Sequence, residues 1–213
     1  FFARTYPSDL ATAQGLRGLV DHYGWQRVGI VTVDDEDGTA LAREVEGELK
    51  AELPARVVVR ASFPYEDETP VAAAAYESAL RALSDAQVSV VIAIVFDKQL
   101  APLVDAADAL GMFDGRHQAA WVTTDSITEE GVHALPPATR AHVAGMLQFS
   151  SSPNATSRAR FEAAFLGSGA ADCANDAFDA TAAAADIFAS PVFKDAAYAY
   201  DAVASLALAL SDA

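Results

Sequence analysis

The 213-residue chain carries 30 acidic and 14 basic side chains, and this balance argues against a nucleic-acid partner because phosphate contacts need clustered lysine and arginine. A composition of 52% hydrophobic and 21% charged residues is that of a folded globular protein, long enough to bury one core or two small ones. The longest apolar run, residues 88–96, is about half as long as a membrane-spanning helix and predicts a buried strand.

The start of the chain predicts an extended entry, a capped helix and a buried strand, in that order. Pro7 biases the residue before it toward an extended conformation, and Ser8 or Asp9 is placed to accept from the first free N–H groups of a helix. Apolar residues recur at helical spacing until Gly24, which favours the end of the helix. The β-branched run at 28–33 is too apolar for a strand with one wet face.

Short apolar runs alternate with longer amphipathic segments as far as residue 149. This alternation is typical of β-α-β units, and it predicts an α/β fold in which a largely parallel sheet is flanked by helices on both faces. We expect five strands at residues 28–33, 56–63, 88–96, 118–123 and 141–149, and helices between them at 39–51, 72–83, 98–110 and 127–135.

An acidic turn at residues 34–38 follows the first strand. Clustered acids in such a turn are a feature of calcium loops, but the ligand alternation and the closing glutamate of an EF-hand are missing. Acidic residues are also favoured at a helix N-terminus by the positive end of the helix dipole. We therefore interpret the turn as the approach to a helix and predict no metal site.

The sequence pattern changes after residue 149. A polar segment, SSSPNATS, is followed by a helix expected at 158–166 and by alanine-rich segments, with no further convincing strand. We therefore divide the chain into an α/β domain at residues 1–149 and an incomplete helical part at 150–213. Because those helices would expose apolar faces on their own, we interpret the chain as a fragment of a larger domain.

The single cysteine, Cys173, permits no internal disulfide. Two explanations stay open, a cytosolic origin and a partner cysteine that lies outside the fragment. Asn154 begins the triplet Asn-Ala-Thr, which is a glycosylation site if the chain is secreted.

Enzyme signatures are absent from the sequence. There is no G-x-G-x-x-G after the first strand, no phosphate-binding G-x-x-x-x-G-K-[ST] and no G-x-S-x-G nucleophile motif. The four histidines show no metal-ligand spacing with one another or with Cys173. We therefore predict a protein that is not an enzyme, with no cofactor and no catalytic residues.

In open α/β sheets, ligands bind beyond the carboxyl ends of the strands. That rule selects Asp37 after the first strand, Asp97 after the third, and Thr124 and Asp125 after the fourth. A cleft edged with carboxylates suits a ligand that carries an ammonium group. The simpler alternative is that these side chains cap helices, as Asp125 and Ser126 could do for the helix that follows them.

Three stretches resemble a known receptor family: FFARTYPSD with the following GWQRVGIVTV, then WVTTDS at 121–126, and YAYDAVASLALAL at 198–210. They are similar to the type I periplasmic-binding-protein fold in its receptor form. This form is the "Venus flytrap" ectodomain of class C G-protein-coupled receptors of the metabotropic glutamate and GABA-B kind. Bacterial branched-chain amino-acid-binding proteins share a looser version. The resemblance runs from end to end and implies that the chain is part of a bilobed domain.

The resemblance also implies which residues bind a ligand. In glutamate-type receptors, the aspartates of the PSD and W-x-x-S-D motifs lie near the ligand's ammonium group. The matching residues here are Asp9, preceded by Ser8, and Asp125, preceded by Thr124. The spacing from Trp121 to Asp125 is kept, which makes the second match the better one.

Two departures from the family argue against glutamate as the ligand. Asp37 stands where the family often has an aromatic residue that stacks on the ligand. Asp195 falls at or beside the position of the lysine that holds the distal carboxylate of glutamate, and Lys194 matches only if the alignment slips by one residue.

The function implied by the resemblance is binding of a small amino-acid-like ligand in the cleft between two lobes, on the extracellular side of the plasma membrane. Ligand contact with both lobes would favour the closed state, and hinge closure would carry the signal. Homo- or heterodimers through the lobe faces are expected, with membrane attachment only through regions outside this chain. The alternatives are a periplasmic solute-binding component of an amino-acid transporter, a ligand-free lobe that acts as a dimerisation or allosteric partner, and a cytosolic doubly wound enzyme.

Overall fold

The computed structural model of the protein describes residues 8–65, 70–113 and 118–150, all of which belong to one compact unit, Ser8–Ser150. The expected helical part at 150–213 lies outside the described residues except for its first residue, and so do Asn154, Cys173 and Asp195. The division of the chain into two lobes therefore stays a prediction.

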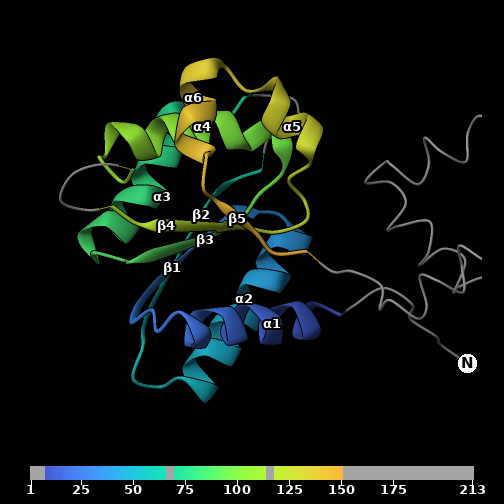
Figure 1. The fold of residues 1–213 in the computed structure, drawn as a ribbon, viewed down its shortest axis with the longest axis vertical. Helices are drawn as coiled ribbons and strands as arrows, with labels where there is room; N and C mark the ends of the chain where they lie inside the picture. The colour runs from blue at the N-terminus through green and yellow to red at the C-terminus, as the bar shows by residue number, and fades with distance from the viewer. Residues whose placement is uncertain (1–7, 66–69, 114–117, 151–213) are drawn as a thin grey trace, which may run out of the picture. The chain divides into compact units, whose positions relative to one another are not determined.

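Five parallel strands form a single sheet, as predicted (Figure 1). Their order across the sheet is β2-β1-β3-β4-β5, so that β1, β3 and β4 occupy interior positions. The strands are β1 (Arg27–Asp34), β2 (Val57–Pro64), β3 (Val90–Ile94), β4 (Ala120–Thr123) and β5 (Leu147–Gln148).

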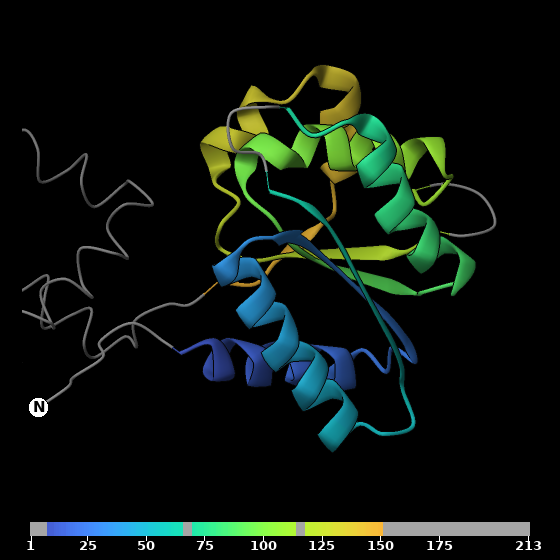
Figure 2. The same ribbon diagram turned by 180° about the vertical axis from the view of Figure 1, so that it is seen from behind.

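Helices cover both faces of this sheet, which confirms the predicted layering. Figures 1 and 2 show α1 and α2 on one face and α3 and α4 on the other, with α5 and α6 beside α4. None of these described helices is long and apolar enough to cross a bilayer. The helices are α1 (Asp9–His22), α2 (Glu36–Glu52), α3 (Ala73–Asp85), α4 (Asp97–Ala109), α5 (Glu129–Ala134) and α6 (Pro137–Val143).

The apolar run of β1 is explained by the two cores that the sheet separates. Val28 and Ile30 belong to the core under α1 and α2, whereas Val31 and Val33 belong to the core under α3 and α4. Successive side chains of a strand point to opposite faces, so a strand covered on both sides has no wet position. Burying each such side chain contributes about 1.5–3 kcal/mol, and this makes the central strands the most strongly specified part of the fold.

The first helix begins and ends as the sequence predicts. The Ser8 hydroxyl accepts from the N–H of Ala11 at 3.2 Å, which satisfies one of the free donors of the first turn of α1. At the other end, Gly24 takes a φ of +66°, a left-handed conformation that glycine adopts without steric cost.

Two expectations about the later chain were wrong in detail. The helix expected to begin near residue 39 begins at Glu36, because Asp35 caps it by accepting from the N–H of Gly38 at 2.7 Å. The strand expected at 141–149 is reduced to β5, because α6 occupies the residues before it. Pro137 supplies a helix start with no N–H to satisfy, and Gly145, at φ +95°, turns the chain into the short strand.

A close contact joins α1 to the chain that leaves β5. Gly15 lies against the ring of Phe149, and a Cβ added at Gly15 would stand 2.3 Å from the ring carbon Cζ. Phe149 is held in place by its own N–H, which donates to the carbonyl of Thr123 at 2.7 Å. Glycine at this position in α1 therefore makes room for an aromatic ring, at the cost of helix propensity.

We predict that Gly15→Ala and Gly18→Ala in the full chain will have opposite effects on stability. A Cβ at Gly18 meets nothing within 4 Å, so Gly18→Ala should gain the helix propensity of alanine, about 0.5–1 kcal/mol. Gly15→Ala must displace Phe149, and overpacking of this kind costs about 1–3 kcal/mol. Urea unfolding would measure the difference, and equal gains for the two variants would contradict the contact.

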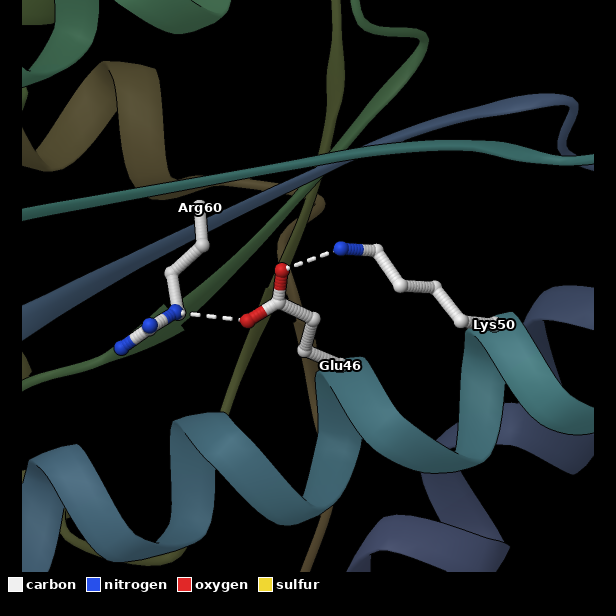
Figure 3. A network of polar contacts seen from close by, with 3 residues as sticks. All are labelled: Glu46, Lys50 and Arg60. Carbon is white, nitrogen blue, oxygen red and sulfur yellow. Dashed lines mark hydrogen bonds and ion pairs between the residues drawn. The ribbon is translucent and has the colours of Figure 1, made fainter.

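An ion-pair network ties α2 to the edge strand β2 (Figure 3). One carboxylate oxygen of Glu46 accepts from Lys50 Nζ at 2.7 Å, and the other accepts from Arg60 Nε at 2.8 Å. The Lys50 hydrogen bond is the main cause that lowers the pKa of Glu46, with the charges of Lys50 and Arg60 acting in the same direction and burial opposing them.

This network predicts a pH-dependent share of stability. Because folding lowers the pKa of Glu46, its contribution is present above the ordinary pKa of an unfolded glutamate and is lost as the pH falls through the lower folded value. Glu46→Gln should cost about 0.5–1 kcal/mol near pH 7 and nothing once both states are protonated. Denaturant unfolding at a series of pH values would measure this cost. Glu44→Gln on the same helix is the control, and a pH-independent cost would contradict the account.

Candidate functional site

The parallel sheet brings the predicted ligand-binding residues to one edge. The carboxyl ends of β1, β3 and β4 lie side by side, with Thr32 paired to Ile94 and Ala93 paired to Thr123. The helices α2 and α4 begin directly after β1 and β3, so their first turns lie at this edge. The start of α1 belongs to the same edge, because α1 leads into the amino end of β1 and therefore runs against the strands (Figure 1). We call this region the carboxyl edge.

Two of the predicted residues open α1 and one lies in the first turn of α2. The Ser8 hydroxyl caps α1, and Asp9 stands half-buried as its first residue. Asp37 is exposed on α2, which leaves its carboxylate open to solvent at the carboxyl edge. The negative charges of Asp9 and Asp37 lie at helix N-termini, where the helix dipole favours them. Stabilisation of a helix start and binding of a ligand therefore involve the same residues.

The loop after β4 carries the other predicted pair, and its two side chains differ in accessibility. Thr124 is 1% exposed, and its hydroxyl has no hydrogen-bond partner in the part of the chain that the structure describes. A ligand contact from Thr124 would therefore need its main chain. Asp125 is half-buried and takes part in at least one polar or electrostatic interaction.

Asp97 is hydrogen-bonded to Thr128, at the downstream end of the loop after β4. Its carboxylate accepts from the N–H of Thr128 at 2.8 Å and from the Thr128 hydroxyl at 2.6 Å. The Thr128 oxygen in turn accepts from the N–H of Gly131 at 2.9 Å, so Thr128 is the N-cap of α5. The alternative that Asp125 and Ser126 cap this helix was wrong, because the helix begins later than expected.

A cavity of about 340 Å³ lies behind the loop, between the end of β4 and the helices α4, α5 and α6. Apolar side chains form most of its wall, among them Leu100, Val132 and Met146. Gln148 lines it as well, and its side-chain amide donates to the carbonyl of Ile127. The loop therefore borders the cavity on one side, and Gln148 of β5 holds it through the carbonyl of Ile127.

Sequence reasoning did not identify Thr128, Gly131 or Tyr65 as residues of this edge. Thr128 could have been found from the order Thr-Glu-Glu, since a threonine before two acids is a typical helix start. Position 131 requires glycine, because a Cβ there would clash with Asp97 at 2.2 Å from its carboxylate carbon. Tyr65 is an exposed aromatic after β2, with Lys98 Nζ 4.6 Å from its ring centroid, and no sequence pattern pairs these two.

The carboxyl edge carries several carboxylates beside the lysine Lys98, and such an edge suits a small ligand that carries a positive group. Within residues 8–65, 70–113 and 118–150, no group of three or more histidine, cysteine, aspartate or glutamate side chains is arranged to hold a metal ion. The acids come from separate helices and loops, so they line a surface and form no metal-binding cluster there.

Two similar proteins are informative. A curated protein named "Glutamate receptor 3.2", from Arabidopsis thaliana, is 28% identical over 158 residues, which are 69% of this chain and 16% of that protein. A solved structure of an extracellular ligand-binding receptor from Verminephrobacter eiseniae ef01-2 superposes with a TM-score of 0.55 at 13% identity, covering 70% of this chain and 39% of the other. The second match shows a shared fold, and the chain spans well under half of either protein.

The family match extends over the whole chain. The family described as the receptor family ligand binding region matches residues 1–213. This agrees with the predicted type I periplasmic-binding-protein-like fold and with the parallel lobe that the structure contains. The chain therefore belongs to the receptor ligand-binding-region family.

Proposed function

We propose that this chain is part of the extracellular ligand-binding region of a receptor and binds a small amino-acid-like ligand at the carboxyl edge. Asp125 and Asp9 pair with the ligand's ammonium group, while the main chain at Thr124 and the Ser8 turn complete the contact. Asp37 lies at the mouth of the cleft. The observation that supports the proposal is that the topology places carboxylates of α1, α2 and the β4 loop at the same edge of the sheet.

The ligand class follows from charge and from the departures seen in the sequence. A desolvated ammonium–carboxylate pair is directional and strong, so an acid-lined edge selects a cationic group. The same acids repel a ligand with a second carboxylate, and the lysine expected to neutralise it is replaced near Asp195. We propose an amino acid other than glutamate or aspartate.

The mechanism we propose is hinge closure. A ligand held by this lobe and by a second lobe binds the closed state more tightly than the open one and therefore increases the closed population. In a class C receptor of this type, closure is passed on through lobe faces that form homo- or heterodimers. The plant relative is named a glutamate receptor, which supports a receptor of the amino-acid-sensing kind.

A second candidate is a periplasmic solute-binding component of an amino-acid transporter. It is favoured by the bacterial source of the solved structure that shares the fold. Both candidates bind a ligand at the same edge without chemical turnover. They differ in what closure contacts, a receptor partner or a transporter.

The test of the proposal is a thermal-shift measurement on the full chain with each natural L-amino acid. A ligand that binds only the native state must raise the melting temperature as its concentration rises. We expect at least one uncharged amino acid to do so, and glutamate to do so least. A chain that melts cooperatively but responds to no amino acid would contradict the proposal.

We predict that Asp125→Asn will remove most of this response. Hydrogen bonds to charged groups contribute about 1.5–3 kcal/mol, so the Kd should rise by roughly ten- to a hundredfold. Asp85→Asn is the matched control, because Asp85 ends α3 at the opposite edge of the sheet. Calorimetric titration would measure both variants, and an equal loss in the two would show that net charge, and not Asp125, determines binding.

A further inference from the structure

The carboxylate of Asp97, which follows β3, is occupied by hydrogen bonds. It receives the N–H and the hydroxyl of Thr128, from an element 31 residues away in the sequence. A different side chain caps the start of α4: Gln99 Oε1 accepts from the N–H of Phe96, the N-cap residue, at 2.8 Å. The hydrogen bonds of Asp97 therefore stabilise the start of α5 and not the start of its own helix.

Thr128 makes this contact directional. Its hydroxyl proton is donated to Asp97 while its oxygen accepts from the N–H of Gly131, so the hydroxyl serves both sides at once. Gly131 has no side chain to separate the two helices, and a Cβ at that position would stand 2.2 Å from Asp97 Cγ. The Asp97–Thr128–Gly131 contact thus fixes the distance between α4 and α5.

The segment that this contact holds is the loop of residues 124–127, which carries Asp125. Its upstream end is fixed in the sheet, where Thr123 pairs with Ala93 and Gln148. Its downstream end is held by the bond from Thr128 to Asp97, and Ile127 just before it is 4% exposed. A short loop fixed at both ends leaves Asp125 little freedom.

We propose that Asp97 is a positioning residue for the ligand site: it holds the 124–127 loop through Thr128 and makes no contact with the ligand itself. This inference rests on the proposed function, in which Asp125 binds the ammonium group. It replaces the sequence-based expectation that Asp97 lines the cleft as a ligand-binding acid. The sequence could not separate these roles, because a carboxylate after a buried strand fits both.

The two roles differ in what they require of residue 97. A residue that attracts the ligand's ammonium group must be charged, so Asp97→Asn and Asp97→Ala should weaken binding alike. A residue that positions the loop must hold Thr128, and an asparagine can do so by accepting from the N–H and donating to the hydroxyl oxygen. The conservative variant therefore separates positioning from direct contact.

The experiment is a calorimetric titration of the full chain with glycine, which presents the ammonium and carboxylate groups without a side chain. We expect about a tenfold higher Kd for Asp97→Ala and for Thr128→Val, and less than about threefold for Asp97→Asn and Thr128→Ser. The double variant Asp97→Ala with Thr128→Val should bind no worse than either single variant, since both remove one contact.

Multiplicative losses in the double variant, or an Asp97→Asn variant as weak as Asp97→Ala, would overturn the proposal. Amide hydrogen exchange without ligand separates this failure from failure of the proposed function. If the native chain binds no amino acid, the proposed function fails, and exchange at the Thr128 and Gly131 amides decides whether Asp97 orders the loop. Faster exchange in Asp97→Ala with native exchange in Asp97→Asn supports the contact, and unchanged exchange in both overturns it.

Discussion

The central strands of the sheet are buried on both faces, and this burial determines the arrangement of the elements around them. Every residue of β3 is buried, and the side chains of β1 divide between two separate hydrophobic cores. Strands of this kind are stable when helices cover both faces, and a helix that crosses over from one strand to the next lets the strands run parallel. A parallel sheet has all its carboxyl ends at one edge, so the position of the candidate site follows from the packing of the core.

The sequence predicted this arrangement well where apolar pattern and helix capping agreed. Val28 to Val33 could be recognised as a strand covered on both sides, and Ser8 with Gly24 marked the two ends of α1. It failed at residues 141–149, where the apolar pattern of a strand was in competition with Pro137 as a helix start. Local side-chain chemistry decided that competition, and periodicity alone cannot weigh it.

The candidate site shows a similar division. Strand ends and the family resemblance selected Asp9, Asp37, Asp97, Thr124 and Asp125, and the topology places all of them at the carboxyl edge. What the sequence could not show is burial and pairing: Thr124 has a buried side chain, and Asp97 is bonded to Thr128. Such contacts join residues far apart in the chain, and no local pattern encodes them.

A ligand at the carboxyl edge of this sheet would protect the amides around it, so amide hydrogen exchange with and without a panel of natural L-amino acids is the decisive measurement. We expect slower exchange on ligand addition in the 124–127 loop and in the first turns of α1 and α2, which carry the acids. The amino ends of the strands should exchange as before. Protection confined to the amino edge, or no protection with any amino acid, would contradict binding at the carboxyl edge.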